Sequence, residues 1–268
     1  MTEARDPPVA ATEAVLRRIG PLAVAVSGGV DSMTLAFLAH RALAGRARMF
    51  HAASPAVPPE AGARVRDYAG RLGWDLRVVS AGEFADADYL RNPMNRCFFC
   101  KTNLYGAIAR YTDWTIASGT NLDDLGDYRP GLRAAAELEV VSPLRDAGLG
   151  KRDVRRLARR LGLPVWDKPA SPCLSSRIPY GSPVTRGKLA AVEAAEAYLS
   201  ELPLRELRVR HFGPAARIEV PAEDLEVVRS RMAAIGRRFA ALGFARIELA
   251  EFRSGALNDA LDPTGLGE

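Results

Sequence analysis

An apolar run that ends in two glycines stands near the start of the sequence. Residues 22–33 read LAVAVSGGVDSM, and apolar residues then recur at helical intervals as far as residue 43. This pattern predicts a buried strand, a short loop and a helix. Because glycine has no Cβ atom, successive backbone N–H groups of such a loop can curve around an anion, toward which the positive end of the helix also points. The segment therefore predicts a phosphate-binding loop; the alternative is a glycine-rich turn without a ligand.

The same alternation of short apolar runs and amphipathic segments continues along the first part of the chain. It predicts strands at residues 48–53, 75–79 and 114–118, helices at 61–72 and 98–111, and one more strand at 140–142. Alternation of this kind is typical of an α/β fold with a parallel sheet covered by helices on both faces. Ligands of such sheets bind beyond the carboxyl ends of the strands.

A connection rich in Pro, Ser and Gly, residues 164–183, separates this part from the rest. Beyond it the pattern predicts helices at 188–202 and 222–242 and strands at 204–212, 216–220 and 245–252. We therefore expect two domains: residues 1–168 with the parallel sheet, and residues 169–268 as a smaller α+β domain for substrate binding or oligomerisation.

The glycine-rich loop lacks the lysine of a G-x-x-x-x-G-K-[ST] motif, which disfavours hydrolysis at a γ-phosphate. A second polar segment, SGTNLDDLGDYRPGLR at 118–133, follows the fourth predicted strand, at 114–118, and so is expected at the same edge. It offers hydroxyl, amide and carboxylate groups that suit a ribose and a hard cation. They are Thr120, Asn121, Asp123, Asp124 and Asp127. The alternative is a polar turn, since Asn, Asp and Gly dominate turns.

Arginine supplies most of the positive charge of the chain, which has a net charge of +5. Of 37 basic residues four are lysines, which leaves 37 − 4 = 33 arginines. The densest basic run, KRDVRRLARR at 151–160, places Val154, Leu157 and Ala158 at helical spacing. This favours a solvated amphipathic helix over an RNA-binding face. No appended RNA-binding module is evident, so a nucleic-acid partner is not expected.

The three cysteines raise a question of their own. The N-terminus lacks the apolar core of a signal peptide and no stretch is apolar over the roughly 20 residues of a membrane span, so we expect a cytoplasmic protein without a membrane partner. An odd number of thiols in a reducing compartment does not favour a disulfide framework. Cys97 and Cys100 form a C-x-x-C pair, and Cys173 lies in the connection. From the residues alone, three interpretations stay open: a zinc site, a dithiol redox pair, or separately buried thiols. A zinc site would typically need a fourth ligand.

The SGGVDS segment resembles the PP-loop of ATP pyrophosphatases. Ser27, Gly28, Gly29, Asp31 and Ser32 match that motif. The resemblance implies a loop that grips the β- and γ-phosphates of ATP as the pyrophosphate that leaves when ATP adenylates an acceptor. It also implies Mg²⁺ nearby, with Asp31 as the residue that acts on the metal.

Six motifs occur together in one order: SGGVDS, RCFFCK, GTNLDDLGDYRPG, SPL, LGLPVWDKPASPCLSSRIPYG and RVRH. From about residue 22 to residue 252 the chain thus resembles the LarE family, ATP-dependent sulfur transferases that help make a nickel-pincer nucleotide cofactor. The resemblance implies a PP-loop domain of the adenine nucleotide alpha hydrolase-like fold. The residues expected to hold ATP are Ser27, Gly28, Gly29, Asp31, Ser32, Gly119, Thr120, Asn121 and Asp124.

The resemblance also implies the substrate and the reaction. ATP adenylates a carboxylate of pyridinium-3,5-biscarboxylic acid mononucleotide, and a sulfur nucleophile at Cys173 then displaces AMP to give a thiocarboxylate. The residues that match the substrate pocket of the family are Ser176, Arg177, Glu196, Arg208, Arg210 and Glu219. A planar guanidinium suits the phosphate of a mononucleotide. For Arg208 and Arg210 the alternative is an exposed strand with solvated arginines.

Two cysteine patterns occur in the family. In one, the late cysteine gives up its own sulfur and becomes dehydroalanine. In the other, three cysteines hold a [4Fe–4S] cluster with one iron open to sulfide or another sulfur donor, and Cys97, Cys100 and Cys173 match this pattern. The resemblance further implies a homo-oligomer. The rival functions are a PP-loop tRNA thiolase that uses an iron–sulfur cluster and a non-catalytic module that binds ATP and a cluster.

Overall fold

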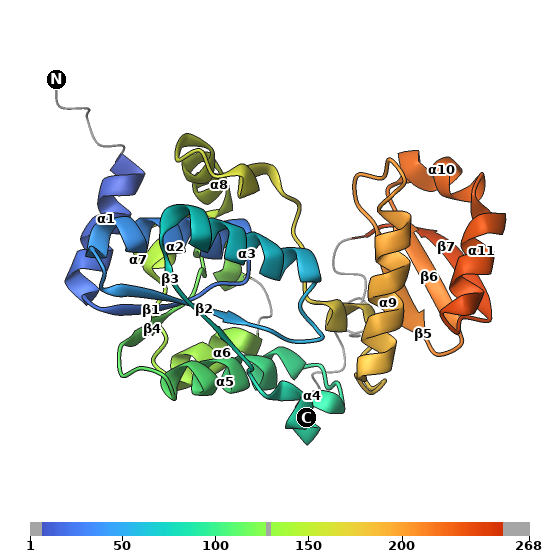
Figure 1. Cartoon of the computed structure of the whole chain (residues 1–268), viewed down its shortest axis with the longest axis horizontal. Helices are drawn as coiled ribbons and strands as arrows, with labels where there is room; N and C mark the ends of the chain where they lie inside the picture. The colour runs from blue at the N-terminus through green and yellow to red at the C-terminus, as the bar shows by residue number, and fades with distance from the viewer. Residues whose placement is uncertain (1–6, 127–129, 254–268) are drawn as a thin grey trace. The chain divides into compact units, whose positions relative to one another are not determined.

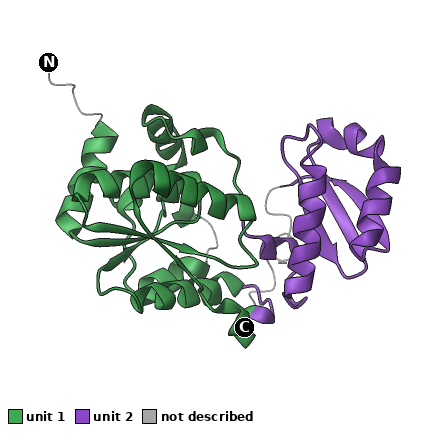
Figure 2. Ribbon diagram, viewed as in Figure 1, with its two compact units in different colours: residues 1–89, 95–171 green, residues 90–94, 172–268 purple. Residues whose placement is uncertain are grey.

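The computed structural model describes residues 7–126 and 130–253, and the chain divides into two compact units (Figure 2). The first unit comprises residues 1–89 and 95–171, and the second comprises residues 90–94 and 172–268. Residues 90–94 belong to the second unit because Asn92 anchors them there. The Asn92 side-chain amide donates hydrogen bonds to the carbonyl oxygens of Pro179 (2.7 Å) and Ser182 (2.8 Å). The change of unit after residue 171 lies inside the Pro-, Ser- and Gly-rich connection.

A four-stranded parallel sheet forms the centre of the first unit, as the sequence predicts. Its strands, in the spatial order β3-β2-β1-β4, are β3 (Asp75–Val79), β2 (Ala47–Ala52), β1 (Leu22–Ala25) and β4 (Thr115–Ala117). Leu22 is paired with Ala47 on one side and with Thr115 on the other. From β1 the chain adds β2 and β3 on one side and then returns to add β4 on the other side of β1. The carboxyl ends of β1 and β4 are therefore the point of the sheet at which the strand order reverses, the switch point.

Helices cover both faces of this sheet, α2 and α3 on one side and α5 and α6 on the other (Figure 1). The helices of this part are α1 (Pro7–Ile19), α2 (Val30–Leu43), α3 (Pro59–Leu72), α4 (Ala87–Leu90), α5 (Arg96–Ala109), α6 (Pro130–Glu137), α7 (Pro143–Asp146) and α8 (Lys151–Arg160). All four residues of β1 are buried, because a sheet covered on both faces leaves no side of its central strand in water.

The strand predicted at residues 140–142 is reduced to a single bridge between Ala117 and Val141. Pro143 follows at the first turn of α7. Proline has no N–H to donate to a ladder and its φ suits a helix start, so the chain leaves the sheet after one pair.

The second unit contains a three-stranded sheet in the order β5-β6-β7. Its strands are β5 (Arg208–Phe212), β6 (Ala215–Val220) and β7 (Arg246–Glu251), and its helices are α9 (Arg186–Leu199), α10 (Leu225–Arg229) and α11 (Met232–Ala241). β5 and β6 are antiparallel, whereas β6 and β7 are parallel. Val209, Ile218 and Phe239 join a core between sheet and helices. The unit is therefore α+β, as predicted.

The helix predicted at residues 222–242 is broken in two at Ser230 and Arg231. The Ser230 hydroxyl donates to the carbonyl oxygen of Val227 at 2.8 Å. A serine that bonds a nearby backbone group competes with the helical ladder, and the periodicity of apolar residues does not reveal this competition. Within residues 7–126 and 130–253, no helix is both long enough and apolar enough to cross a membrane.

Candidate functional site

The loop after β1 is held in shape by its own serines. Ser27 N–H donates to Ser32 Oγ at 3.1 Å, and Ser32 Oγ donates to the carbonyl oxygen of Gly29 at 3.1 Å. α2 begins directly after Gly29, and no described side chain caps this helix start. The first backbone N–H groups of a helix lack partners inside the helix and carry partial positive charge. The predicted phosphate loop thus presents uncapped donors at the carboxyl end of β1.

Residues of α3 and β2 contact the loop and fix its backbone. Gly28 has φ +84°, and a Cβ at this position would lie 2.9 Å from the carbonyl oxygen of Ala61 in α3, so only glycine fits. Arg64 of α3 donates to the carbonyl oxygen of Gly28 at 2.8 Å, and burial lowers the pKa of its guanidinium. His51 of β2 donates from Nδ1 to the carbonyl oxygen of Val26 at 2.8 Å, and burial lowers its pKa. The loop is therefore fixed before any ligand arrives.

Gly119 brings the end of β4 against the same loop. A Cβ on Gly119 would lie 2.7 Å from the backbone nitrogen of Ser32 and 2.9 Å from its Cα. Side-chain rotation cannot relieve such an overlap, since the opposing atoms are backbone. The structure thus gives Gly119 a packing role in joining the two strand ends at the switch point.

Gly119→Ala is expected to lower the free energy of unfolding by about 1–3 kcal/mol, the usual cost of forcing an extra methyl group into a packed site. Urea-induced unfolding would measure it. Gly106→Ala is the matched control: Gly106 lies within α5 and an added Cβ there would meet nothing within 4 Å. That control should be neutral or slightly stabilising, because alanine favours a helix. Equal stability of the two variants would contradict the close contact.

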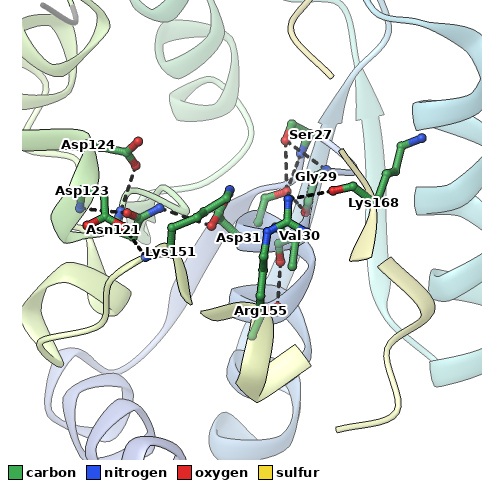
Figure 3. Close-up of polar contacts among 12 residues, drawn as sticks. Ser27, Gly29, Val30, Asp31, Asn121, Asp123, Asp124, Lys151, Arg155 and Lys168 are labelled. Carbon is green, nitrogen blue, oxygen red and sulfur yellow. Dashed lines mark hydrogen bonds and ion pairs between the residues drawn. The ribbon is translucent and has the colours of Figure 1, made fainter. Parts of the chain in front are cut away.

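A ring of polar contacts closes the site on the other side of the loop (Figure 3). Asp31, in the first turn of α2, accepts from Asn121 Nδ2 at 3.2 Å and from the ammonium of Lys151. Asp123 accepts from the backbone N–H of Lys151 at 2.6 Å, and its own N–H donates to Asn121 Oδ1 at 3.0 Å. The Asn121 N–H donates to Asp124 Oδ2 at 3.0 Å. Asn121 is buried. Through these hydrogen bonds the ring links the segments that follow β1, β4 and α7.

Sequence reasoning missed the basic residues of this site. The structure confirms α8 as an amphipathic helix, with Val154 and Leu157 buried, yet its Lys151 reaches Asp31. Arg155 of α8 donates to the carbonyl oxygens of Trp166 (2.7 Å) and Lys168 (2.8 Å), which fixes the chain beside the loop (Figure 3). The sequence held one signal for these basic residues: lysine is rare in this chain, and two of its four lysines, Lys151 and Lys168, lie at this site.

The pKa of the Lys168 ammonium is lowered, first by burial and then by the charge of Arg64. Two cations that repel each other beside a glycine-rich loop suit a ligand with several negative charges. On the opposite segment, Thr120 Oγ1 and Ser118 Oγ are 2.9 Å apart. Asp127, which the sequence also suggested, lies outside the described residues.

A magnesium ion would find one suitable protein carboxylate in Asp31. Among the residues that the structure describes, neither unit gathers three or more His, Cys, Asp or Glu side chains into a metal cage. Magnesium is usually held by one or two carboxylates together with substrate phosphates and water, so the donor set fits this ion.

The three cysteines belong to different units. Cys97 is exposed and Cys100 is half-buried, and both lie in the first turns of α5. α6 packs closely there, since a Cβ on Gly131 would lie 3.5 Å from the carbonyl oxygen of Cys97. Cys173, in the second unit, directly precedes the 3₁₀ turn η4 (Leu174–Arg177) and is half-buried. Their joint ligation of a cluster stays a prediction.

The residues predicted to bind substrate gather on one side of the second unit. Arg177 forms a two-point ion pair with Glu196 (2.9 and 3.1 Å), and Arg210 pairs with Glu219 at 2.9 Å. The side chains of the two arginines are 5% and 3% exposed. The alternative of solvated arginines on an exposed strand is wrong for both Arg208 and Arg210, because β5 is buried at these positions.

Arg208 differs from the other two arginines of this group. It contacts Glu206 at 3.3 Å, and its guanidinium lies 4.6 Å from the centre of the Phe252 ring. Burial is the largest cause that lowers its pKa, followed by the charge of Arg177. A guanidinium stacked on an aromatic ring keeps N–H groups at its edge for a further acceptor.

The sequence is similar to those of several known proteins over much of its length. The asparagine synthase family model matches residues 8–97. The pyridinium-3,5-bisthiocarboxylic acid mononucleotide synthase of Lactiplantibacillus plantarum is 34% identical over 259 residues, which cover 92% of each chain. An uncharacterized Synechocystis protein, slr1717, is 40% identical over 247 residues, 89% of this chain and 92% of that protein. The glutamine-hydrolyzing GMP synthase of Aeropyrum pernix is 31% identical over 217 residues, 70% of this chain and 41% of that enzyme.

The chain has a parallel sheet with SGGVDS at its switch point, and the asparagine synthase family model matches the part that contains β1, β2 and β3. These features define a PP-loop ATP pyrophosphatase, a class of ATP-dependent enzymes. Within that class, the identity to the L. plantarum synthase over nearly the whole length of both proteins is decisive. The chain belongs to the LarE family.

Proposed function

We propose that this enzyme is an ATP-dependent sulfur transferase that converts a carboxylate of pyridinium-3,5-biscarboxylic acid mononucleotide into a thiocarboxylate. One observation in the first unit carries the proposal. The phosphate loop ends in the uncapped start of α2, which lies beside the ring of polar contacts formed by Asp31, Asn121 and Lys151. Membership of the LarE family supports the substrate class.

The first step is adenylation. A carboxylate oxygen of the substrate attacks the α-phosphorus of ATP, the bond from that phosphorus to the bridging oxygen breaks, and pyrophosphate leaves with the electron pair. Backbone N–H groups of residues 28–31 hold the leaving pyrophosphate, with Lys168 and Arg64 supplying positive charge nearby. Asp31 would hold Mg²⁺, which neutralises phosphate charge when it is bound. Lys151, now paired with Asp31, keeps that carboxylate oriented.

The second step transfers sulfur. A sulfur nucleophile at Cys173 attacks the acyl carbon, and AMP leaves with the electron pair of the C–O bond; phosphate esters make good leaving groups. A [4Fe–4S] cluster held by Cys97, Cys100 and Cys173 would supply an open iron position for added sulfide. Without the cluster, Cys173 Sγ itself would attack and form a thioester with the substrate. A base would then remove the Cα proton of Cys173 and the Cβ–Sγ bond would break, so that the thiocarboxylate leaves with the electron pair of that bond and Cys173 becomes dehydroalanine.

Analysis of the nucleotide products tests the proposed function. With Mg²⁺, ATP and the carboxylated mononucleotide, the enzyme is expected to release AMP and pyrophosphate in equal amounts. ADP and phosphate as products would contradict it, as would equal activity with tRNA in place of the mononucleotide. ATP binding without any pyrophosphate release would point instead to a non-catalytic module.

Arg208 is the residue we expect to bind the substrate phosphate. Arg208→Ala should weaken binding of the mononucleotide by about 10- to 100-fold, since a hydrogen bond to a charged group contributes about 1.5–3 kcal/mol. Arg208→Lys should recover part of this loss, because lysine keeps the charge but not the planar fork. Isothermal titration with the mononucleotide measures both variants. Unchanged binding by Arg208→Ala would rule out this contact.

A further inference from the structure

The chain around Cys173 has little regular structure of its own. Cys173 precedes a 3₁₀ turn of four residues, and the backbone bond that closes this turn runs from Ser176 N–H to the carbonyl oxygen of Cys173 at 2.9 Å. A turn this short does not fix its own orientation. Side chains from elsewhere in the second unit must therefore hold the thiol in place.

Arg177 supplies the first of these contacts. Its Nη1 donates to the carbonyl oxygen of Pro172 at 3.0 Å and to Ser176 Oγ at 2.9 Å, and lies 3.5 Å from the carbonyl oxygen of Cys173. One guanidinium thus spans the turn from the residue before the thiol to the residue three positions after it. Because guanidinium is planar, these contacts fix the backbone on both sides of Cys173 at once.

Glu196 orients this guanidinium and links it to the sheet. Its carboxylate accepts from Nε and Nη2 of Arg177, and Glu196 Oε1 also accepts from the backbone N–H of Val209 in β5 at 2.9 Å. From the same strand, Arg210 donates to the carbonyl oxygen of Ser176 at 2.8 Å. The turn is therefore attached to β5 at both ends.

The charges of this assembly are already balanced. Arg177 with Glu196 and Arg210 with Glu219 are two buried ion pairs, and each arginine also donates to a carbonyl oxygen within residues 172–176. A phosphate that took Arg177 as its ligand would have to displace either the two-point pair with Glu196, whose carboxylate is 16% exposed, or the contacts of Nη1 with Pro172 and Ser176. Leaving a buried charge unpaired is costly. The arrangement is suited to holding the turn rather than to receiving an anion.

We propose that Arg177, oriented by Glu196, is a positioning residue that sets the direction of the Cys173 thiol for sulfur transfer, and is not a ligand of the substrate phosphate. This inference rests on the proposed function, because it gives the thiol its task there. It separates Arg177 from Arg208, the phosphate ligand, although both are arginines of the same side of the unit.

Two conservative variants test the inference in the full-length protein. Glu196→Gln keeps an oxygen that can accept from Val209 but removes the charge that pairs with Arg177; Arg177→Lys keeps charge but cannot span the turn. Glu248→Gln and Arg217→Lys are matched controls, since this pair on the same sheet is 40% and 42% exposed and joins β6 to β7. Anaerobic labelling with iodoacetamide, followed by peptide mass spectrometry, gives the rate at each cysteine separately.

Both test variants are expected to label Cys173 at least threefold faster, with unchanged rates at Cys97 and Cys100. They should lower the rate constant of sulfur transfer at least tenfold, while the KM for the mononucleotide and the rate of pyrophosphate release stay within twofold. Hydrogen exchange should rise only at residues 172–177. The two controls should match the unaltered protein in every measurement.

Other outcomes would overturn the inference. A KM that rises tenfold with unchanged Cys173 labelling would make Arg177 a substrate ligand. Faster exchange throughout β5 and β6 would show that the pair merely holds the unit together. If the unaltered protein forms no adenylate from the mononucleotide, the proposed function fails, whereas labelling and exchange still decide whether Arg177 positions Cys173.

Discussion

Asp31→Ala is expected to reduce substrate-dependent release of pyrophosphate from ATP by about 100- to 1,000-fold, the range typical for loss of one preorganised electrostatic contact. Asp31 is the carboxylate at the start of α2 that would hold Mg²⁺, and it is also the acceptor for Lys151 and Asn121. Its removal takes away the metal ligand and leaves both donors misoriented. A pyrophosphate assay at saturating ATP measures the loss.

The fold should survive this substitution. The Asp31 side chain is 21% exposed and its ion pair reaches the surface at Lys151, so the cost to stability should be about 1 kcal/mol or less. Asp67→Ala is the matched control, an exposed aspartate in α3 paired with Arg71, and it should leave pyrophosphate release unchanged. Near-normal activity of Asp31→Ala would show that the metal is held elsewhere.

Cys173→Ser is expected to abolish sulfur transfer and to leave pyrophosphate release within about twofold. The two steps separate because the phosphate loop belongs to the first unit and Cys173 to the second. A serine hydroxyl is nearly the same size as the thiol, yet it neither ligates iron as a thiolate does nor carries sulfur. The assay compares AMP formed with thiocarboxylate formed; retention of thiocarboxylate would exclude Cys173 as the sulfur carrier.

Cys97→Ser distinguishes the two sources of sulfur. If a cluster carries it, this variant should lose the iron and acid-labile sulfide of the anaerobic protein and stop turning over. If Cys173 is sacrificed, the variant should complete one transfer as the unaltered protein does, and Cys173 should become dehydroalanine. Multiple turnovers by a protein that contains no iron would contradict the cluster.

The parallel sheet was predictable because each strand is a short apolar run bounded by glycine or polar residues. The apolar run from residue 22 was expected to form a strand and β1 spans Leu22–Ala25; the strand predicted at residues 75–79 coincides with β3. The sequence reasoning did not identify α1 or α6. α6 is eight residues long and begins at Pro130, inside the segment interpreted as a polar loop. The break at Ser230 was missed because a local hydroxyl bond leaves no trace in the apolar pattern.

The phosphate loop was predictable from SGGVDS because its residues are contiguous and each has a local reason to be there. Lys151 was not, because its partner Asp31 lies 120 positions earlier in the chain, and periodicity says nothing about pairs so distant. The ion pair of Arg210 with Glu219 was hidden in the same way. A sequence shows an arginine on a strand but not the glutamate beside it on the next strand.

The ring around Asp31 has a consequence for how the first unit opens. Asp123 holds the first backbone N–H of α8, and Lys151 of that same turn holds Asp31, so fraying of α8 releases the carboxylate at the phosphate loop. Local unfolding of the helix start and loosening of the loop are then a single event with one free energy. A nucleotide that binds only the closed loop must also slow amide exchange in α8, although no atom of that helix beyond Lys151 need touch it.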